Sequence, residues 1–123
     1  MRMMAFHLYL LLAATAPAAA ADLVGPATVV DGDTIDIGDD RIRLWGIDAP
    51  ERHAPGGPEA SAWLAALLDG RTVRCVDTGG RSYERIVAQC FLADTGEDLA
   101  WLLIDAGHAV DWPRYSGGHY SRR

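Results

Sequence analysis

One short stretch of the chain carries five charged residues whose side chains could act on a common ligand. They are Asp31, Asp33, Arg43, Asp48 and Glu51. Carboxylate oxygens are the ligands that hard cations prefer, so aspartates that converge could hold such an ion. A guanidinium can grip a phosphate through two parallel hydrogen bonds. The stretch therefore predicts a site at which a cation and a phosphate group meet.

The segments between these residues predict a hairpin followed by a stiff loop. An Asp-Gly pair is typical of a tight turn, and positions 34–37 then alternate between apolar and polar residues, as a half-buried strand does. Positions 41–45 form the returning strand. Pro50 disfavours the helical region for the residue before it, so positions 48–51 should be an extended loop. A hairpin with such a loop can bring carboxylates and a guanidinium together.

The rest of the chain predicts further strands and two helices. Pro58 fits the first position of a helix, and an apolar stripe at helical spacing runs from Ala60 to Leu67 before Gly70 ends it. The other expected elements are strands at 27–30, 71–76 and 86–92, a turn at 77–82, a second helix that stops at Gly107, a short strand at 109–110, a mobile segment at 22–26 and a frayed end from Ser116 onward. By pattern alone, this order indicates an α+β fold with an antiparallel sheet.

Two separate blocks of the sequence resemble the thermonuclease (staphylococcal-nuclease-like) family. The first is Asp31-Gly32-Asp33-Thr34, and the second runs from Arg43-Leu44 through Gly46-Ile47-Asp48-Ala49-Pro50-Glu51. The likeness extends more loosely over about 27–115, within a single expected domain at 22–123. It implies a mainly β α+β fold, a five-stranded OB-fold-like barrel with two packed helices. It also implies a Ca²⁺-dependent nuclease that hydrolyses DNA and RNA, with single strands the easier substrate.

The resemblance assigns roles to the acidic residues. Asp33 and Asp48 match the carboxylates that hold one Ca²⁺ in the family, helped by the backbone carbonyl of Ala49. Asp31 lies behind them and would orient the loop or a metal-bound water. Glu51 matches the residue that acts as general base or orients the attacking water. So few protein ligands imply a weak Ca²⁺ site, with a Kd of about 10⁻⁴ to 10⁻³ M.

Two arginines and two tyrosines complete the site that the resemblance implies. Arg43 matches one phosphate-binding arginine. Tyr83-Glu84-Arg85 resembles the family's Tyr-Gly-Arg, so Arg85 would be the second, with Tyr83 near the phosphate or base. Tyr115 aligns with an aromatic residue that stacks near the nucleotide base. Together these residues predict an electrostatic clamp on one phosphate.

The sequence also departs from the family pattern. The family commonly has Asp where this chain has Arg81 and Gly where it has Glu84, and most of the family's last helix is missing. A carboxylate beside Arg85 could weaken a phosphate contact. These departures leave open an alternative, a catalytically impaired OB-fold module that binds nucleic acid or protein. A third reading is a small disulfide-stapled envelope protein whose charged loop only caps strands.

The first residues have the pattern of a secretory signal peptide at 1–21. Arg2 precedes an apolar run at 8–16, and small residues at 18–21 form a cleavage site. A membrane anchor is the other reading, but the run is shorter than the roughly 20 residues that a spanning helix needs. We therefore expect cleavage, a secreted or periplasmic location, and no stable membrane association afterwards.

The charge balance excludes binding of nucleic acid by bulk attraction. The chain has a formal net charge of −6, and it contains no lysine. Phosphate binding normally depends on a basic surface. Contact with a nucleic-acid substrate must therefore come from a few placed arginines and a metal ion. We expect the protein to be a monomer.

The two cysteines, Cys75 and Cys90, are expected to form a disulfide in a secreted protein. They flank a turn-rich stretch, so they could face each other on a hairpin. Closing a loop of this size stabilises the fold by about 3 kcal/mol in the chain-entropy description. Their spacing is not a zinc pattern, and neither has a nearby histidine that would suggest a nucleophile.

Overall fold

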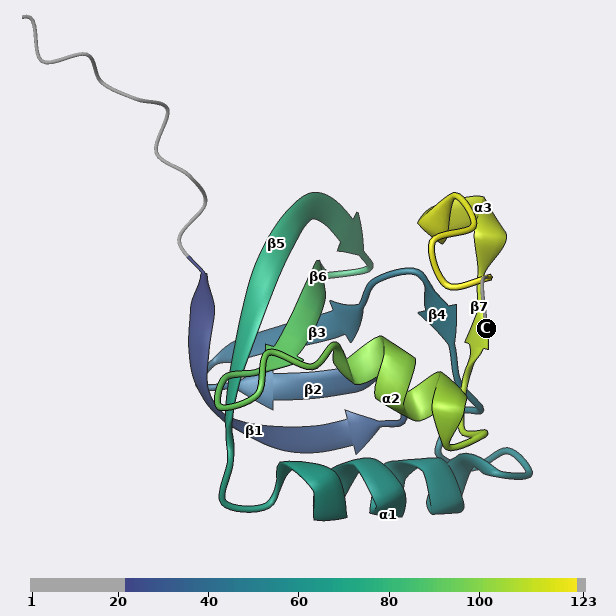
Figure 1. Ribbon diagram of the computed structural model, residues 1–123, viewed down its shortest axis with the longest axis horizontal. Helices are drawn as coiled ribbons and strands as arrows, with labels where there is room; N and C mark the ends of the chain where they lie inside the picture. Colours follow the sequence, from purple (N-terminus) through teal and green to yellow (C-terminus); the bar gives the residue numbers. More distant parts are fainter. Residues whose placement is uncertain (1–21, 122–123) are drawn as a thin grey trace, which may run out of the picture.

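A closed five-stranded barrel forms the centre of the computed structural model, which describes residues 22–121 (Figure 1). The strands follow the order β1 (Leu23–Asp31), β2 (Thr34–Ile37), β3 (Asp40–Leu44), β6 (Arg85–Leu92) and β5 (Thr72–Ser82), and β5 pairs back with β1. All pairs are antiparallel except β3 with β6, which run parallel. The expected mainly β barrel is confirmed.

Three helices and a two-stranded ladder surround the barrel. The helices are α1 (Gly57–Leu68), α2 (Leu99–Asp105) and the short α3 (Pro113–Ser116), one more than the sequence predicts. The ladder joins β4 (Ile47–Asp48) to β7 (Val110–Asp111). Helix α1 packs along β1 below the barrel. Helix α3 follows β7 and lies at one end of the β4–β7 ladder (Figure 1). Within residues 22–121, no helix has the length and apolar character needed to cross a bilayer.

The core is filled by the inward faces of the strands and one face of each longer helix. Alternation along the strands turns β-branched and leucine side chains inward, where they meet apolar residues from both helices. Fully buried examples are Ile35, Ile42, Val73, Leu92, Leu64 of α1 and Leu103 of α2. This closed core gives the loops at the end of the barrel a rigid base.

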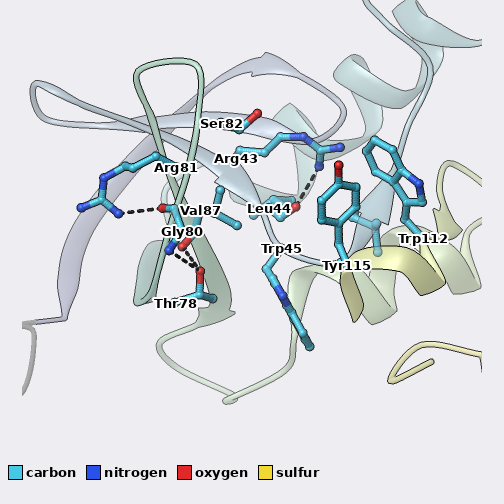
Figure 2. Close-up of a pocket in the computed structure, with 12 residues that line it drawn as sticks. Arg43, Leu44, Trp45, Thr78, Gly80, Arg81, Ser82, Val87, Trp112 and Tyr115 are labelled. Atoms are coloured by element: carbon cyan, nitrogen blue, oxygen red, sulfur yellow. Dashed lines mark hydrogen bonds between the residues drawn. The ribbon is translucent and has the colours of Figure 1, made fainter. Parts of the chain in front are cut away.

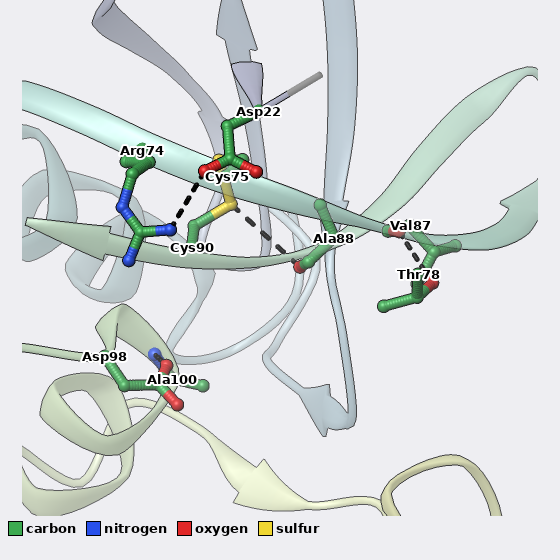
Figure 3. The surroundings of a disulfide bond; sticks show 9 residues. All are labelled: Asp22, Arg74, Cys75, Thr78, Val87, Ala88, Cys90, Asp98 and Ala100. Carbon is green, nitrogen blue, oxygen red and sulfur yellow. Dashed lines mark hydrogen bonds and ion pairs between the residues drawn. A yellow bond between two sulfur atoms is a disulfide. The ribbon is translucent and has the colours of Figure 1, made fainter. Parts of the chain in front are cut away.

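The predicted disulfide is present in the hairpin of β5 and β6. Cys75 and Cys90 are direct partners in the strand register, and their sulfur atoms are bonded (Figure 3). Both residues are buried. The bond therefore fixes the two strands that carry the second predicted arginine, Arg85, at the far end of the hairpin.

The expected turn at 77–82 is wrong, because β5 continues through it. The strand register shifts between Asp77 and Arg81, and β5 ends at Ser82. The Asp77 carboxylate accepts the Gly79 N–H at 2.7 Å and the Arg81 guanidinium at 3.1 Å. Gly79 adopts a φ of +85°, so the glycines form an irregularity inside the strand. The hairpin turn instead comprises Tyr83 and the residue after it.

The N-terminal segment at 22–26, expected to be mobile, is part of the barrel. β1 begins at Leu23, which pairs with Cys75 of β5. Asp22 forms an ion pair with Arg74 at 3.1 Å (Figure 3). The predicted signal peptide at 1–21 lies outside the described residues.

The C-terminal segment, expected to fray from Ser116 onward, is folded against the barrel. Tyr120 is 1% exposed, and its hydroxyl donates to Asp98 at 2.7 Å. Asp98 also accepts the Ala100 N–H at the start of α2. Burial, followed by the Asp98 carboxylate, raises the pKa of Tyr120 above its usual value. The small polar residues around Tyr120 hid this anchor from the sequence pattern.

The folded tail also explains why position 46, which links β3 to β4, is a glycine. A Cβ at Gly46 would lie 2.9 Å from Ser116 Cβ and 3.0 Å from the Tyr120 ring, and the residue has a φ of +79°. Ser116 and Ser121 both donate to the Asp111 carboxylate of β7. The tail therefore locks β7 and α3 in place beside β4.

Tyr120→Phe should lower the free energy of unfolding by about 1.5–3 kcal/mol, the usual contribution of a hydrogen bond to a charged group. Urea denaturation of the variant and the parent protein measures the change. Tyr115→Phe is the matched control, because Tyr115 is 54% exposed and no hydrogen bond of its hydroxyl is found in the described chain. Equal stability of Tyr120→Phe and the parent would contradict this assignment.

Candidate active site

Asp33 and Arg43 lie against each other at one end of the barrel. Asp33 follows β1, Arg43 is near the end of β3, and each is 9% exposed. Arg43 Nη2 lies 3.4 Å from Asp33 Oδ2. The strand register pairs Thr34 with Arg43, and the Leu44 N–H donates to the Asp33 carbonyl at 2.8 Å. The hairpin thus makes the contact that its sequence predicts.

The Arg43 guanidinium is largely removed from water and has two carboxylates and a second guanidinium nearby. Burial lowers the pKa of Arg43, the nearby positive charge of Arg85 lowers it further, and the carboxylates of Asp33 and Asp48 oppose the shift. A guanidinium does not lose its proton in proteins, so Arg43 keeps its positive charge. Its Nη1 donates to the Leu44 carbonyl at 2.8 Å, which fixes the guanidinium plane.

Asp48 and Ala49 approach the same position from β4. Asp48 Oδ1 lies 4.0 Å from Arg43 Nη2, the atom that Asp33 also contacts. The Ala49 N–H donates to Asp33 Oδ2 at 3.3 Å. The Asp48 side chain is 59% exposed, in contrast to Asp33. The structure therefore brings together the three residues predicted to hold a metal.

The oxygen atoms of this group suit a hard cation in type. Among residues 22–121, no set of three or more His, Cys, Asp or Glu side chains is arranged to hold a metal. The available donors are two carboxylates and a backbone carbonyl. Asp33 is oriented by Thr34, whose hydroxyl donates to Oδ1 at 3.0 Å, and Asp48 is open to water. So few ligands fit a weak calcium site, and the ligand set stays a prediction.

Glu51 is positioned by two hydrogen bonds that tie its loop to the turn after β1. The Ala49 N–H donates to Asp33, and the Arg52 N–H donates to Asp31 Oδ1 at 3.0 Å. Glu51 lies between these two anchors. Its side chain is exposed, and within the described chain no hydrogen bond or ion pair engages its carboxylate. Asp31 is thus bonded to the loop that carries Glu51, and its role in the site stays a prediction.

The loop after Glu51 turns tightly enough to require a glycine at the start of α1. The Glu51 carbonyl accepts the Ala54 N–H at 2.8 Å. A Cβ at Gly57 would lie 1.8 Å from the same carbonyl oxygen. The close approach of these two backbone segments fixes the position of the Glu51 backbone.

Arg85, at the start of β6, lies on the same side of the barrel as the aspartates. Its Nη1 donates to the Thr34 hydroxyl at 3.1 Å, and that hydroxyl donates to Asp33. Its Nε and Nη2 donate to the carbonyl and hydroxyl of Ser82. The two guanidiniums of Arg43 and Arg85 are close enough to interact electrostatically. Two like charges held together favour an anion between them.

Tyr83 and Glu84 form the turn beside Arg85. Tyr83 is 92% exposed with a φ of +47°, an uncommon conformation for a residue with a side chain. Its ring centroid lies 5.9 Å from the Arg85 guanidinium carbon. No ion pair joins Glu84 to Arg85 in the part of the chain that the structure describes. The departure from the family's glycine therefore leaves Arg85 unneutralised.

A cavity of about 440 Å³ opens next to Arg43 (Figure 2). Its walls come from the end of β3, the irregular part of β5 and the C-terminal segment. The main lining side chains are Arg43, Trp45, Thr78, Arg81, Val87, Trp112 and Tyr115. Arg81 points away from Arg43 (Figure 2) and pairs with Asp77, so it does not add a charge beside Arg43.

Trp112 is the cavity residue that the site prediction missed. Its ring packs edge-on against Tyr115 with centroids 4.5 Å apart, and the Arg43 guanidinium carbon lies 5.8 Å from it. The sequence signal was the aromatic and basic run from Trp112 to Tyr115. Only the long-range pairing of β7 with β4 brings this run to Arg43.

The chain is similar to several known proteins. The staphylococcal nuclease homologue family matches residues 41–122, more than half of the chain. The succinoglycan biosynthesis protein ExoI of Rhizobium meliloti (strain 1021) is 39% identical over 114 residues, which cover 84% of this chain and 59% of that protein. An uncharacterized endonuclease of Escherichia coli is 33% identical over 105 residues, or 81% of this chain and 68% of that protein. A probable endonuclease LCL3 of Phaeosphaeria nodorum is 33% identical over 87 residues, or 64% of this chain and 29% of that protein.

Gly57→Ala should displace the loop that carries Glu51, because the new Cβ would overlap the Glu51 carbonyl. Overpacking of this kind lowers the free energy of unfolding by about 1–3 kcal/mol, which urea denaturation measures. Gly80→Ala is the control, since a Cβ there would have its nearest neighbour at 3.4 Å. If both variants match the parent in stability, the loop is not fixed at this contact.

Proposed function

The chain belongs to the staphylococcal nuclease homologue family, and we propose that it is a Ca²⁺-dependent nuclease that hydrolyses phosphodiester bonds of DNA and RNA. The observation that carries the proposal is the convergence of Asp33, Asp48, Arg43 and Arg85 at one end of the barrel. The relatives named as endonucleases support a nuclease-like activity. Because the chain spans 59% of the ExoI protein, the activity of that whole protein is not carried over.

The two arginines answer the first requirement of phosphodiester hydrolysis. The phosphate is anionic and repels nucleophiles, so its charge must be neutralised before and during attack. Arg43 is buried, and its attraction for a phosphate is therefore screened less by water than that of a surface arginine. Arg85 supplies a second guanidinium, held in place by Ser82 and Thr34. Together they bind the phosphate and stabilise the added negative charge of the transition state.

Glu51 answers the second requirement, the activation of water. Its carboxylate is exposed and forms no hydrogen bond or ion pair in the described residues, and the loop that carries it is anchored at Ala49 and Arg52. An ionised carboxylate in this position can accept the proton of an attacking water or orient that water. A Ca²⁺ held by Asp33, Asp48 and the Ala49 carbonyl would supply further positive charge at the phosphate.

The open cavity favours a single strand as the substrate. A base stacked within a duplex cannot reach the rings of Trp112 and Tyr115, whereas a splayed base can stack on them. Stacking on aromatic side chains is tolerant of sequence. The cavity therefore suits both DNA and RNA strands.

Secretion or a periplasmic location is consistent with the disulfide. Bonds such as Cys75–Cys90 persist in oxidising compartments and are rare in the cytosol. The predicted signal peptide at 1–21 points the same way. A weak calcium site would be filled in an extracellular setting. We infer that the mature protein acts there as a monomer.

The alternative is a binding module of the same fold with impaired catalysis. The observation that favours it is the engagement of Arg85, whose three nitrogens all donate within the protein. A phosphate would have to share or replace these bonds. Tight binding of single-stranded DNA without any turnover would support this alternative.

Purified protein should hydrolyse single-stranded DNA with Ca²⁺ and lose that activity in EDTA. Glu51→Gln should lower kcat by about 10²- to 10⁴-fold, the usual contribution of a general base. Glu59→Gln, an exposed residue of α1, is the control with the same change of charge. Acid-soluble nucleotide release measures the rates. Activity that survives EDTA, or equal rates for Glu51→Gln and the parent, would refute the proposed mechanism.

Arg85→Lys should lower kcat for single-stranded DNA by about 10²- to 10³-fold, because a lysine cannot keep the forked geometry of the guanidinium. Arg74→Lys, on β5 of the same hairpin, is the matched control, since Arg74 is paired with Asp22 and does not line the cavity. The same nucleotide-release assay compares the two variants. If Arg74→Lys lost as much activity as Arg85→Lys, the second phosphate contact would be wrongly assigned.

A further inference from the structure

Most arginines in the described part of this acidic chain are neutralised by a carboxylate. Of the eight arginines in residues 22–121, five form ion pairs with aspartates. The three that form no ion pair within this range are Arg52, Arg85 and Arg114. In a protein with a net charge of −6, guanidiniums without a carboxylate partner mark where an external anion is most favoured.

Arg114 lies at the outer end of a row that begins at Arg43. The row has two rings between two cations: Arg43 is 5.8 Å from the Trp112 ring, Trp112 is 4.5 Å from Tyr115, and Arg114 is 5.7 Å from the Tyr115 ring. Trp112 and Tyr115 line the cavity beside Arg43. Arg114 therefore lies beside the aromatic wall of this cavity.

The backbone of Arg52 lies beyond the other end of the β4–β7 ladder. In the ladder, Ile47 pairs with Asp111, and Asp48 pairs with Val110, so β4 runs away from α3. Its chain continues through Asp48 to Arg52, whose N–H is held by Asp31. Figure 1 shows α3 at one end of the β4–β7 ladder and the segment that leads into α1 at the other. Arg43 and Asp48 lie between the two ends.

The three arginines without an ion pair in the described residues are thus distributed along the site. Arg114 lies beside Tyr115 at the cavity, Arg85 shares the Thr34 hydroxyl with Asp33, and the backbone of Arg52 follows Asp48 along the chain. A single strand repeats its charge about every 3.4 Å of rise when stacked, so arginines on both sides of Arg43 can meet neighbouring phosphates. Neutral or acidic residues at the ends would instead favour a mononucleotide.

We propose that Arg114 and Arg52 bind the phosphates on either side of the one held by Arg43 and Arg85, so that the protein recognises an internal stretch of a nucleic-acid strand. The inference rests on the proposed function for its substrate class. It adds two contacts that act on affinity and on its salt dependence. Neither arginine takes part in the chemical step.

Equilibrium binding tests these contacts without requiring hydrolysis. A fluorescently labelled single-stranded oligonucleotide is titrated with the protein in EDTA at several NaCl concentrations, and anisotropy gives the Kd. Each phosphate contact in a single strand adds about 0.7 to the slope of log Kd against log salt concentration. Arg114→Gln and Arg52→Gln should each reduce the slope by about that amount. Arg114→Lys, which keeps the positive charge, should have the slope of the parent protein.

Arg71→Gln is the matched control, because it removes the same charge from a different part of the surface. Arg71 follows α1 directly and pairs with Asp94 at 3.1 Å, outside the site. Its slope should equal that of the parent protein. Loss of an exposed ion pair of this kind changes stability little.

Slopes for Arg114→Gln and Arg52→Gln that match the parent protein would overturn the inference. An equal reduction of the slope in Arg71→Gln would also overturn it, because the effect would then be one of net charge. The absence of any binding at low salt would overturn it as well. The proposed nuclease activity is judged separately by hydrolysis with Ca²⁺. If the two Gln variants had reduced slopes and the parent protein did not hydrolyse DNA, the phosphate contacts would be supported and the nuclease activity would be excluded.

Discussion

A guanidinium and a carboxylate, Arg43 and Asp33, lie nine-tenths buried against each other at the end of the barrel. A charge removed from water is costly unless it is paired and its remaining hydrogen bonds are made. The structure meets this requirement with a distinct partner for each: the Leu44 carbonyl for Arg43, and the Thr34 hydroxyl and Ala49 N–H for Asp33. These same bonds fix the entry of β4 and the loop to Glu51. The same hydrogen bonds thus stabilise the hairpin and set the geometry of the site.

The parts of the fold that the sequence predicts are those set by local rules. The Asp-Gly turn, the period of two in β2 and β3, and the proline after Ala49 act within a few residues of one another, and they bring Asp33 to Arg43. The disulfide was predictable because Cys75 and Cys90 flank a hairpin. The barrel was predicted from the family resemblance, which rests on two sequence blocks at the family's spacing.

The parts that the sequence did not predict depend on distant contacts. Gly79 and Gly80 are typical of a turn, yet the Asp77 carboxylate binds Arg81 across them and keeps the strand going. The tail has no periodic pattern, and its order depends on one buried tyrosine and on the carboxylate of Asp98, far away in the sequence. Trp112 reaches the site only because β7 pairs with β4. No local propensity carries such information.

The tail anchored by Tyr120 divides the cleft between two parts of the chain. All five barrel strands are complete at Leu92, whereas β7, α3 and Tyr120 come afterwards along the chain. Both arginines therefore belong to the barrel, and Trp112 and Tyr115 belong to a segment that packs onto it. A change that releases Tyr120 would loosen the aromatic wall of the cleft and leave its charged wall in place.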